Sequence, residues 1–161
     1  MIKSATLACV IALAAPVANA QGTNVAFGTI RQDTSAPVEA SADNLSVDQS
    51  TGIATLTGNV VIGQGELRLT APNVVVIYRS SEVGIAKLEA SGGVTLVSGP
   101  DAAEAQNADY DVDRGTIVMT GDVLVTQGQS ALTADRMTVN LADGTAQMSG
   151  RVKTILQTGQ N

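Results

Sequence analysis

The sequence predicts an all-β protein, a sandwich, barrel or roll of roughly 14–16 short antiparallel strands. Its sixteen glycines separate short runs of β-branched residues, at intervals of about 8–12 residues. Beyond the first twenty residues, no window shows the apolar stripe of period 3.6 that an amphipathic helix needs. Two short motifs also recur in a fixed order, which is the third sign of a regular β architecture.

These two motifs alternate four times and indicate that the fold is built from four repeats. The first motif is a small polar residue, alanine, then aspartate or proline, found as Ser41-Ala42-Asp43, Thr70-Ala71-Pro72, Asn107-Ala108-Asp109 and Thr133-Ala134-Asp135. The second is Ser/Thr-Gly-x-Val, with glycines at Gly58, Gly92, Gly121 and Gly150. These glycines are 34, 29 and 29 residues apart, and each follows its alanine by 16, 21, 13 and 16 residues. We interpret the unequal gaps as turns of different length between equivalent strands.

The first element, residues 1–20, is predicted to be a cleaved secretory signal peptide. Lys3 supplies the positive region, an apolar run extends from Leu7 to Ala15, and Ala18-Asn19-Ala20 offers a cleavage site, so that Gln21 begins the mature chain. The apolar run is shorter than the roughly 20 residues that a permanent transmembrane helix needs. An uncleaved inner-membrane anchor is the alternative interpretation.

The mature chain is expected to begin with an extended lead-in over residues 21–37, including a short strand from Asn24 to Ile30. The regular domain then spans residues 38–155, and residues 156–161 form a flexible tail. Turns or breaks are expected wherever glycine and polar residues cluster, at 48–52, 63–65, 79–84, 98–101, 113–115, 121–122, 127–130 and 142–144.

Two stretches of the domain need a separate argument. Pro72 lacks a backbone N–H, so we expect it at a strand start or on an edge strand, before the apolar run Val74–Tyr78. Residues 102–108 are rich in alanine, glutamate and glutamine and have some helical propensity. The repeat register nevertheless predicts a strand there.

Composition excludes most chemistry. Removing Lys3 leaves 8 basic against 15 acidic residues, a net charge of about −7 that argues against nucleic acid and against electrostatic attachment to anionic membranes. Histidine is absent and the single cysteine, Cys9, lies in the signal peptide, which excludes Cys–His and Ser–His nucleophiles and the usual zinc sites. We therefore predict no enzyme activity, no cofactor and no metal.

One row of aspartates allows an alternative interpretation as a binding or catalytic site. Asp109, Asp111 and Asp113 stand at i, i+2 and i+4, so they share one face of a strand. Such a row could bind Ca²⁺ or provide a glycosidase pair. We prefer a solvated strand face, because the acidic residues of the other repeats lie in turns or at strand starts, and the chain has almost no aromatic platforms for sugars.

The aliphatic residues on the other strand face either fill an ordinary core or line an elongated groove for an acyl chain. Each methylene buried in such a groove contributes about 0.8 kcal/mol. Strand parity predicts the lining residues Leu56, Val60, Ile62, Leu67, Leu69, Val74, Val76, Leu88, Val94, Leu96, Val112, Ile117, Met119, Val123, Val125, Met137, Val139 and Met148.

Two segments resemble the opening of the OstA-like domain family of lipopolysaccharide transport proteins. They are Ser41-Ala42-Asp43-Asn44-Leu45 with Ala54-Thr55-Leu56-Thr57-Gly58-Asn59-Val60, and Ala134-Asp135-Arg136-Met137 with Gly144-Thr145-Ala146-Gln147-Met148-Ser149-Gly150-Arg151-Val152. The resemblance covers about residues 38–155 and implies a slightly twisted antiparallel β-jellyroll, open along one side.

The resemblance also implies a function. A family member in the periplasm would hold lipid A acyl chains of lipopolysaccharide in the groove and leave the sugars and phosphates in water. It would receive lipopolysaccharide from an LptC-like inner-membrane protein and pass it to an LptD-like outer-membrane protein. Contacts would form through edge strands, and copies of the chain would stack head to tail.

Three alternatives stay open. An architectural secreted scaffold would have the same repeats with a closed core, and an inner-membrane-anchored LptC-like member would keep its leader. A polysaccharide-degrading enzyme is the weakest alternative, for want of catalytic side chains.

Overall fold

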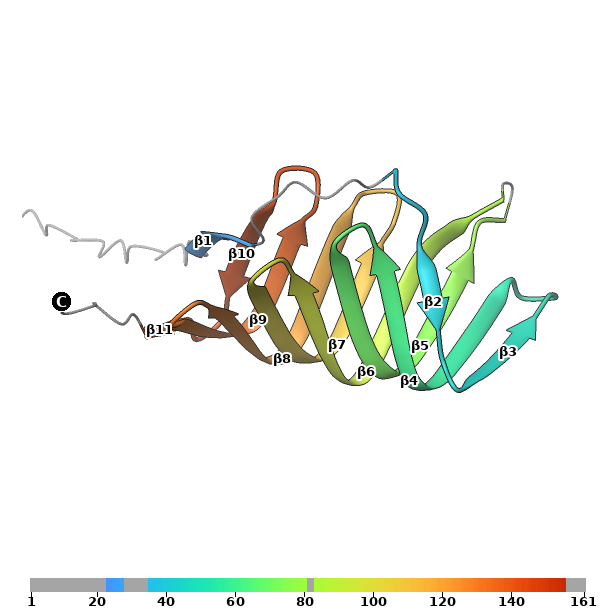
Figure 1. Cartoon of the computed structure of the whole chain (residues 1–161), viewed down its shortest axis with the longest axis horizontal. Coiled ribbons are helices and arrows are strands. Elements are labelled where there is room, and N and C mark those ends of the chain that lie inside the picture. Colours follow the sequence, from blue (N-terminus) through green and yellow to red (C-terminus); the bar gives the residue numbers. More distant parts are fainter. Residues whose placement is uncertain (1–22, 28–34, 81–82, 156–161) are drawn as a thin grey trace, which may run out of the picture.

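The computed structural model describes residues 23–27, 35–80 and 83–155, and these form a single folded β-sheet (Figure 1). The predicted signal peptide, part of the lead-in and the predicted tail at 156–161 lie outside the described residues. The described residues contain eleven strands and no helix, and thus no helix that could cross a membrane. The prediction of an all-β fold is confirmed.

Six long strands form the body of the sheet, and five short ones flank it. The strands are β1 (Thr23–Ala26), β2 (Glu39–Ser41), β3 (Asn44–Asp48), β4 (Ile53–Gln64), β5 (Leu67–Tyr78), β6 (Ile85–Ser98), β7 (Asp101–Asp111), β8 (Thr116–Gln127), β9 (Ser130–Asn140), β10 (Thr145–Ser149) and β11 (Lys153–Ile155). Strands β4 to β9 follow one another as an antiparallel meander within the order β1-β10-β9-β8-β7-β6-β5-β4-β2. In addition, β3 pairs with β4 and β11 pairs with β9.

In every pair of neighbouring long strands the pairing register is interrupted near the middle of the strands, so that the interruptions lie side by side across the sheet. The breaks lie between Thr57 and Val60, Thr70 and Asn73, Ser91 and Val94, Glu104 and Asn107, and Thr120 and Val123. A β-bulge bends its strand and increases the local twist. Aligned across neighbouring strands, these bulges form a corner along which the whole sheet folds, visible as the lower edge of the roll in Figure 1.

The corner divides the sheet into two parts. Leaf A contains β3, residues 53–57, 73–78, 85–91, 107–111, 116–120 and 136–140, and β10. Leaf B contains β2, residues 60–64, 67–71, 94–98, 101–105, 123–127 and 130–134, and β11. We call the side opposite the corner, where the hairpin turns of the two leaves lie, the mouth of the roll (Figure 1).

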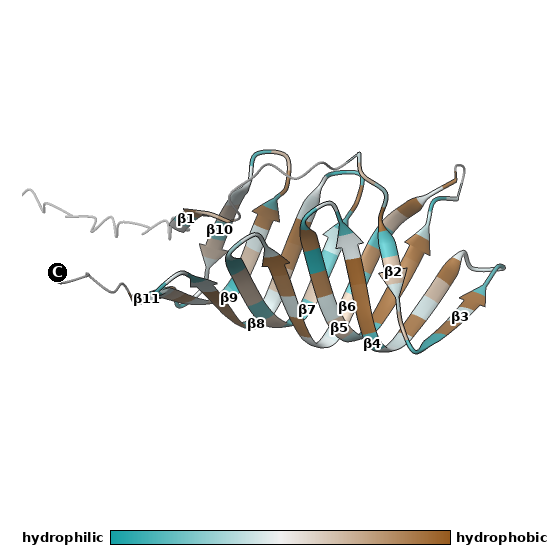
Figure 2. Cartoon of the chain, viewed as in Figure 1, coloured by the Kyte–Doolittle hydropathy of each residue, from teal (hydrophilic) through white to brown (hydrophobic). Residues whose placement is uncertain are grey.

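Alternation along each strand builds the core. In β4 and β8 every second side chain is buried, and the phase is reset at the bulge so that the buried residues of both leaves face inward. Figure 2 shows hydrophobic residues along the long strands on both sides of the bend. The two inner faces therefore cover each other, and one sheet supplies both walls of the interior.

The residues of the two repeated motifs form the corner. The amide N–H of Asp43 donates to the carbonyl of Gly58, and that of Asp135 donates to the carbonyl of Gly150, each at 2.9 Å. Gly58 and Gly150 have φ angles of +79° and +75°, which an L-residue adopts only with strain. Of the alanines in these motifs, Ala71 and Ala134 are buried inside the bend and Ala42 packs against the core partly buried.

This geometry corrects the third copy of the first motif. Across the corner from Gly121 stands Gln106, whose Cβ would lie 2.9 Å from an added Cβ at Gly121. The true third copy is therefore Glu104-Ala105-Gln106, not Asn107-Ala108-Asp109, and its alanine precedes Gly121 by 16 residues. The remaining irregular gap, 21 residues, reflects the longer loop between β5 and β6.

Three further expectations are wrong because the corner bulges lie inside long strands. Gly121-Asp122 forms a bulge inside β8 and not a turn, and the other corner glycines likewise do not end strands β4 and β6. Counting each half-strand separately produced 14–16 strands, where the described residues form eleven. Pro72 lies in the middle of β5, between β4 and β6, because the bulge there does not need its N–H. Residues 102–108 form β7, as predicted.

A glycine substitution tests the corner. Gly150→Ala would place a Cβ 2.7 Å from the Cβ of Asp135 at a positive φ, so we expect a loss of about 2–4 kcal/mol in the free energy of unfolding. The matched control is Gly52→Ala, where φ is +67° but no atom lies within 4 Å; it should lose only about 1–2 kcal/mol. Urea unfolding measures both, and equal losses would show that the corner is not tightly packed.

The Asp135–Arg151 pair predicts a pH dependence. Hydrogen bonding to the Arg151 guanidinium, at 2.5 and 2.9 Å, lowers the pKa of the Asp135 carboxyl below its ordinary 3.8. A lowered folded-state pKa stabilises the fold above the unfolded pKa, and this contribution is lost as pH falls through the folded pKa. Arg151→Gln should therefore be less stable than wild type at neutral pH and equally stable once the carboxyl is protonated. Urea titrations across this range measure the difference, and a pH-independent difference would contradict the pairing.

Candidate functional site

The interior between the two leaves is the candidate site, because one cluster of buried hydrophobic residues extends through both leaves of the described sheet. Of the eighteen predicted lining residues, all but Val112 belong to the buried core cluster, and Val112 packs against it half-buried. Leaf A contributes residues such as Val74, Ile117 and Met137, and leaf B contributes residues such as Ile62, Leu96 and Val125. The structure thus brings the predicted set together. A role in binding stays a prediction.

The prediction missed two kinds of interior residue. The first is a set of alanines with the right parity, Ala54, Ala71, Ala90, Ala103, Ala105, Ala108, Ala134 and Ala146. The second is the larger residues Phe27, Tyr110, Leu132 and Leu141. Strand alternation alone would have found the alanines and Leu132, whereas Phe27 follows β1 and is buried only through the fold of the chain. Small side chains in such number allow the leaves to approach closely.

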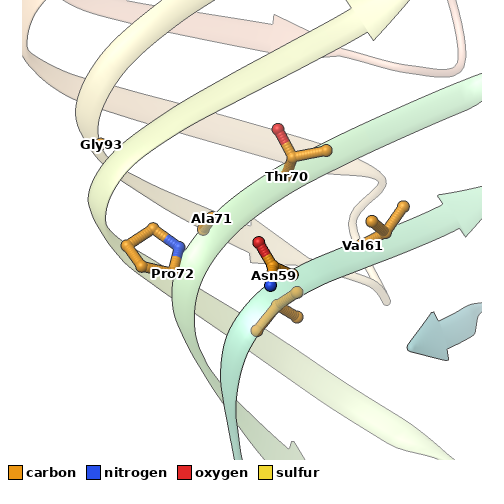
Figure 3. A pocket seen from close by; sticks show the side chains of 7 residues that line it. Asn59, Val61, Thr70, Ala71, Pro72 and Gly93 are labelled. Atoms are coloured by element: carbon orange, nitrogen blue, oxygen red, sulfur yellow. The ribbon is translucent and has the colours of Figure 1, made fainter. Parts of the chain in front are cut away.

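The interior is packed by its own side chains. Every inner hydrophobic residue of the core cluster exposes 7% of its surface or less, and many expose none. The described residues of the two leaves therefore leave no apolar groove already open to an acyl chain, which the sequence led us to expect. The described hollows lie elsewhere. One of about 410 Å³ lies at the corner, where Asn59, Thr70, Pro72 and Gly93 come from neighbouring strands (Figure 3).

Polar contacts close the mouth at two places. The Tyr110 hydroxyl donates to Gln64 Oε1, and Gln64 Nε2 donates to the carbonyl of Ala36 at 3.0 Å. Burial raises the pKa of the Tyr110 hydroxyl above its ordinary value, which keeps it a neutral donor. Further along the mouth, Gln127 Nε2 donates to the carbonyl of Ala26 at 2.6 Å and to Asp101 Oδ2 at 2.9 Å.

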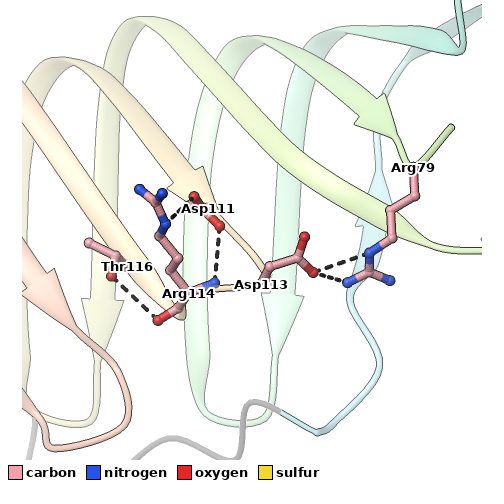
Figure 4. Close-up of polar contacts among 5 residues, drawn as sticks. All are labelled: Arg79, Asp111, Asp113, Arg114 and Thr116. Carbon is pink, nitrogen blue, oxygen red and sulfur yellow. Dashed lines mark hydrogen bonds and ion pairs between the residues drawn. The ribbon is translucent and has the colours of Figure 1, made fainter. Parts of the chain in front are cut away.

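The acidic row on the outer face is an ion-paired surface. Asp109 lies 3.2 Å from Lys87 Nζ, Asp111 lies 3.6 Å from Arg114 Nε, and Asp113 pairs with Arg79 across the hairpin turns (Figure 4). Hydrogen bonding to Arg79 lowers the pKa of Asp113. Among the described residues no cluster of acidic side chains could hold a metal ion. The exposed and ion-paired carboxylates agree with the solvated-face interpretation of the row.

The two ends of the roll expose strand edges together with apolar side chains. At one end β3 pairs only with β4, and its inward-facing Leu45 and Val47 are 63% and 54% exposed. At the other end β11 pairs only with β9. Val152, just before β11, is 36% exposed, whereas Ile155, which is 55% exposed, lies opposite Ala131 on the outer face. The apolar interior therefore reaches the surface at its ends.

Comparisons with known proteins identify the same family by sequence model and by similar curated proteins. Residues 39–145 match the family model described as LptA/(LptD N-terminal domain) LPS transport protein. An uncharacterized protein of Rhizobium meliloti (strain 1021) is 28% identical over 88% of this chain and 82% of its own length. The lipopolysaccharide export system protein LptA of Escherichia coli (strain K12) is 27% identical over 66% of this chain, and the match spans 60% of LptA.

A solved structure supports the fold. The crystal structure of LptH, the LptA homologous periplasmic component of the lipopolysaccharide transport device of Pseudomonas aeruginosa, superposes with a TM-score of 0.69. The match covers 78% of this chain and 99% of the LptH chain, at 17% sequence identity. At this identity the similarity establishes the β-jellyroll fold.

A pair of leucines tests which strand face is interior. Leu96 in β6 is fully buried, whereas Leu124 in β8 is half-buried on the outer face. We expect Leu96→Ala to lose about 2–5 kcal/mol in the free energy of unfolding, because it leaves a cavity between the leaves. Leu124→Ala should lose clearly less in the same urea experiment. The reverse order would mean that the parity of one of these strands is inverted.

Proposed function

Because the chain belongs to the LptA/LptD N-terminal domain family of lipopolysaccharide transport proteins, we propose that it carries lipopolysaccharide across the periplasm with the lipid A acyl chains between its two leaves. The observation that carries the proposal is the continuous aliphatic interior, which spans the sheet and reaches the surface at both ends. The polar part of the lipid would stay outside the mouth.

The distribution of charge supports this orientation of the lipid. The buried residues are hydrophobic except Gln64, Ser98 and Asp101, which lie beside the hairpin turns of leaf B, while ion-paired carboxylates occupy the outer face of leaf A around Asp109 and Asp111. The chain as a whole has a net charge of −6. An acidic outer surface repels phosphate groups, so attraction for the acyl chains must come from burial and not from charge.

The packed interior sets a condition on binding: the leaves must separate before an acyl chain can enter. Each methylene transferred from water gains about 0.8 kcal/mol, but the lipid replaces contacts that the leaves already make with each other. A protein whose competent open state is rarely populated binds with correspondingly reduced affinity. Such an exchange favours reversible binding, which a carrier that hands its cargo on requires.

The corner provides the hinge for this separation. Strands β4 to β9 cross it as continuous chains, so an opening of the mouth does not require the loss of the sheet's hydrogen bonds on either side. Register is already interrupted there, and glycines at positive φ accept changes that other residues resist. The alanines inside the bend add little bulk to be displaced.

The ends of the roll support assembly with partner proteins. Edge strands present unpaired backbone groups, to which another strand can add. We propose that β2 and β3 at one end, and β1 and β11 at the other, extend the sheet into LptC-like inner-membrane and LptD-like outer-membrane proteins or into further copies of this chain. Leu45 and Val47 would then continue the apolar path from one roll to the next.

The leader and domain limits complete the proposal. Residues 1–20 would direct secretion to the periplasm and be removed, and residues 38–155 would form the transport domain. A retained leader would instead give an LptC-like protein anchored in the inner membrane. The mass of the native N-terminal peptide separates the two.

One observation favours a second candidate function. The interior is as closely packed as an ordinary core, which an architectural scaffold with no cargo also requires. The two candidates differ in whether lipid ever reaches the inner side chains.

Photo-crosslinking tests the proposal. A small diazirine amino acid at Ile117 or Val139, both inward, should crosslink to lipopolysaccharide in cells, because these positions line the interior. The controls are the neighbouring outward positions Thr116 and Thr138. Lipid extracted from protein purified from the periplasm provides an independent readout. Equal crosslinking at inward and outward positions, with no extracted lipid, would favour the scaffold.

A further inference from the structure

We propose that Tyr110 and Gln64 form a crossbar that shuts the mouth of the roll, and that lipid loads through the mouth only when this hydrogen bond opens. The inference rests on the proposed function and adds the residue pair that controls access. Tyr110 belongs to leaf A and Gln64 to leaf B, so their bond ties the two leaves together.

The sheet order shows that this bond spans the interior. Gln64 ends β4 and Tyr110 lies on β7, and β5 and β6 stand between these strands. Neighbouring strands are about 4.8 Å apart, so three spacings place β4 and β7 too far apart for a hydrogen bond within the sheet. The two side chains can meet only because leaf B folds over leaf A. Breaking their contact is therefore a condition for the mouth to open at this point.

The other crossing of the mouth has the same construction. Gln127 ends β8 in leaf B, and its acceptor Ala26 belongs to β1, which is again three strands away in the sheet order. In both places a glutamine at the rim of leaf B binds the carbonyl of an N-terminal residue, Ala36 or Ala26. Phe27, whose side chain is buried, donates its amide N–H to the carbonyl of Gly144 in the turn that follows β9. The two crossings lie apart along the mouth, and only the one at Gln64 includes a side chain from the interior.

The burial of Gln64 and Tyr110 explains why a hydrogen bond between them can hold the mouth closed and still open reversibly. Gln64 and Tyr110 are 3% and 2% exposed, so each needs its partner while the mouth is closed. Once the mouth opens, water replaces the lost hydrogen bond, so the crossbar adds about one net bond to the cost of separating the packed leaves. An apolar residue at the same place would lose its contacts to water without replacement. Tyr110 also lies on β7, in the middle of the strand order, where it would obstruct an acyl chain along the mouth.

Removing one oxygen tests the crossbar. Tyr110→Phe keeps the ring and loses the donor, and Tyr78→Phe is the matched control because Tyr78 is 42% exposed at the end of β5. The measurement is the association rate of fluorescent lipid A, kept below its aggregation concentration, in stopped flow. We expect Tyr110→Phe to load about 2–10-fold faster than wild type, the factor that one net hydrogen bond supplies, and Tyr78→Phe to match wild type.

A reversible tether provides the opposite change. In Gln64→Cys/Tyr110→Cys, a cleavable bis-maleimide should join the two leaves and slow loading at least tenfold, and cleavage of the linker should restore it. Each single cysteine variant carrying the same reagent is the control for bulk. If wild type takes up lipid A but Tyr110→Phe loads at the wild-type rate and the tether has no effect, the crossbar is wrong and the transport proposal stands. If wild type takes up no lipid A, both fail.

Discussion

A single sheet folded along an aligned row of bulges is the constraint on which the rest of the structure depends. The register breaks occur at the same level in every pair of long strands, so the bend runs across the sheet. Because side chains alternate along a strand, folding the sheet turns one whole face inward and the other outward. The apolar interior, the ion-paired exterior and the exposed ends all follow from this bend.

The closed interior and the proposed transport role are two aspects of one energetic balance. Leaves that pack against each other make the unloaded protein stable without lipid, and the chain has no disulfide to help it. In the proposed role, the same packing would compete with the acyl chains and keep their binding reversible. Small inner residues such as Ala90 and Ala108 would reduce the bulk that a lipid must displace. Polar contacts at the mouth then hold the leaves shut without making the closure permanent.

Alternation of apolar residues was sufficient to predict an all-β chain and the inward position of the eighteen listed residues, because it depends only on neighbours along the chain. The solvated face of the row from Asp109 to Asp113 was predicted from its spacing, but its ion pairs with Lys87 and Arg79 were not, because they join residues distant in the chain. Glycine was harder to interpret. Gly121 lies in a bulge inside a long strand, yet in the sequence it has the same form as a turn glycine such as Gly115. The third motif copy was misplaced by three residues, because only Gln106 facing Gly121 identifies its true position.

The sequence by itself determined an all-β chain of four repeats, its inner residues and its acidic composition, since each is a property of composition or of short-range periodicity. Only the tertiary structure decided that the half-strands are continuous, that the two inner faces pack shut, and that Tyr110 meets Gln64 across the mouth. Those features depend on contacts between residues dozens of positions apart, such as the 46 that separate this pair. Local patterns contain no record of how far a bend brings one leaf over the other.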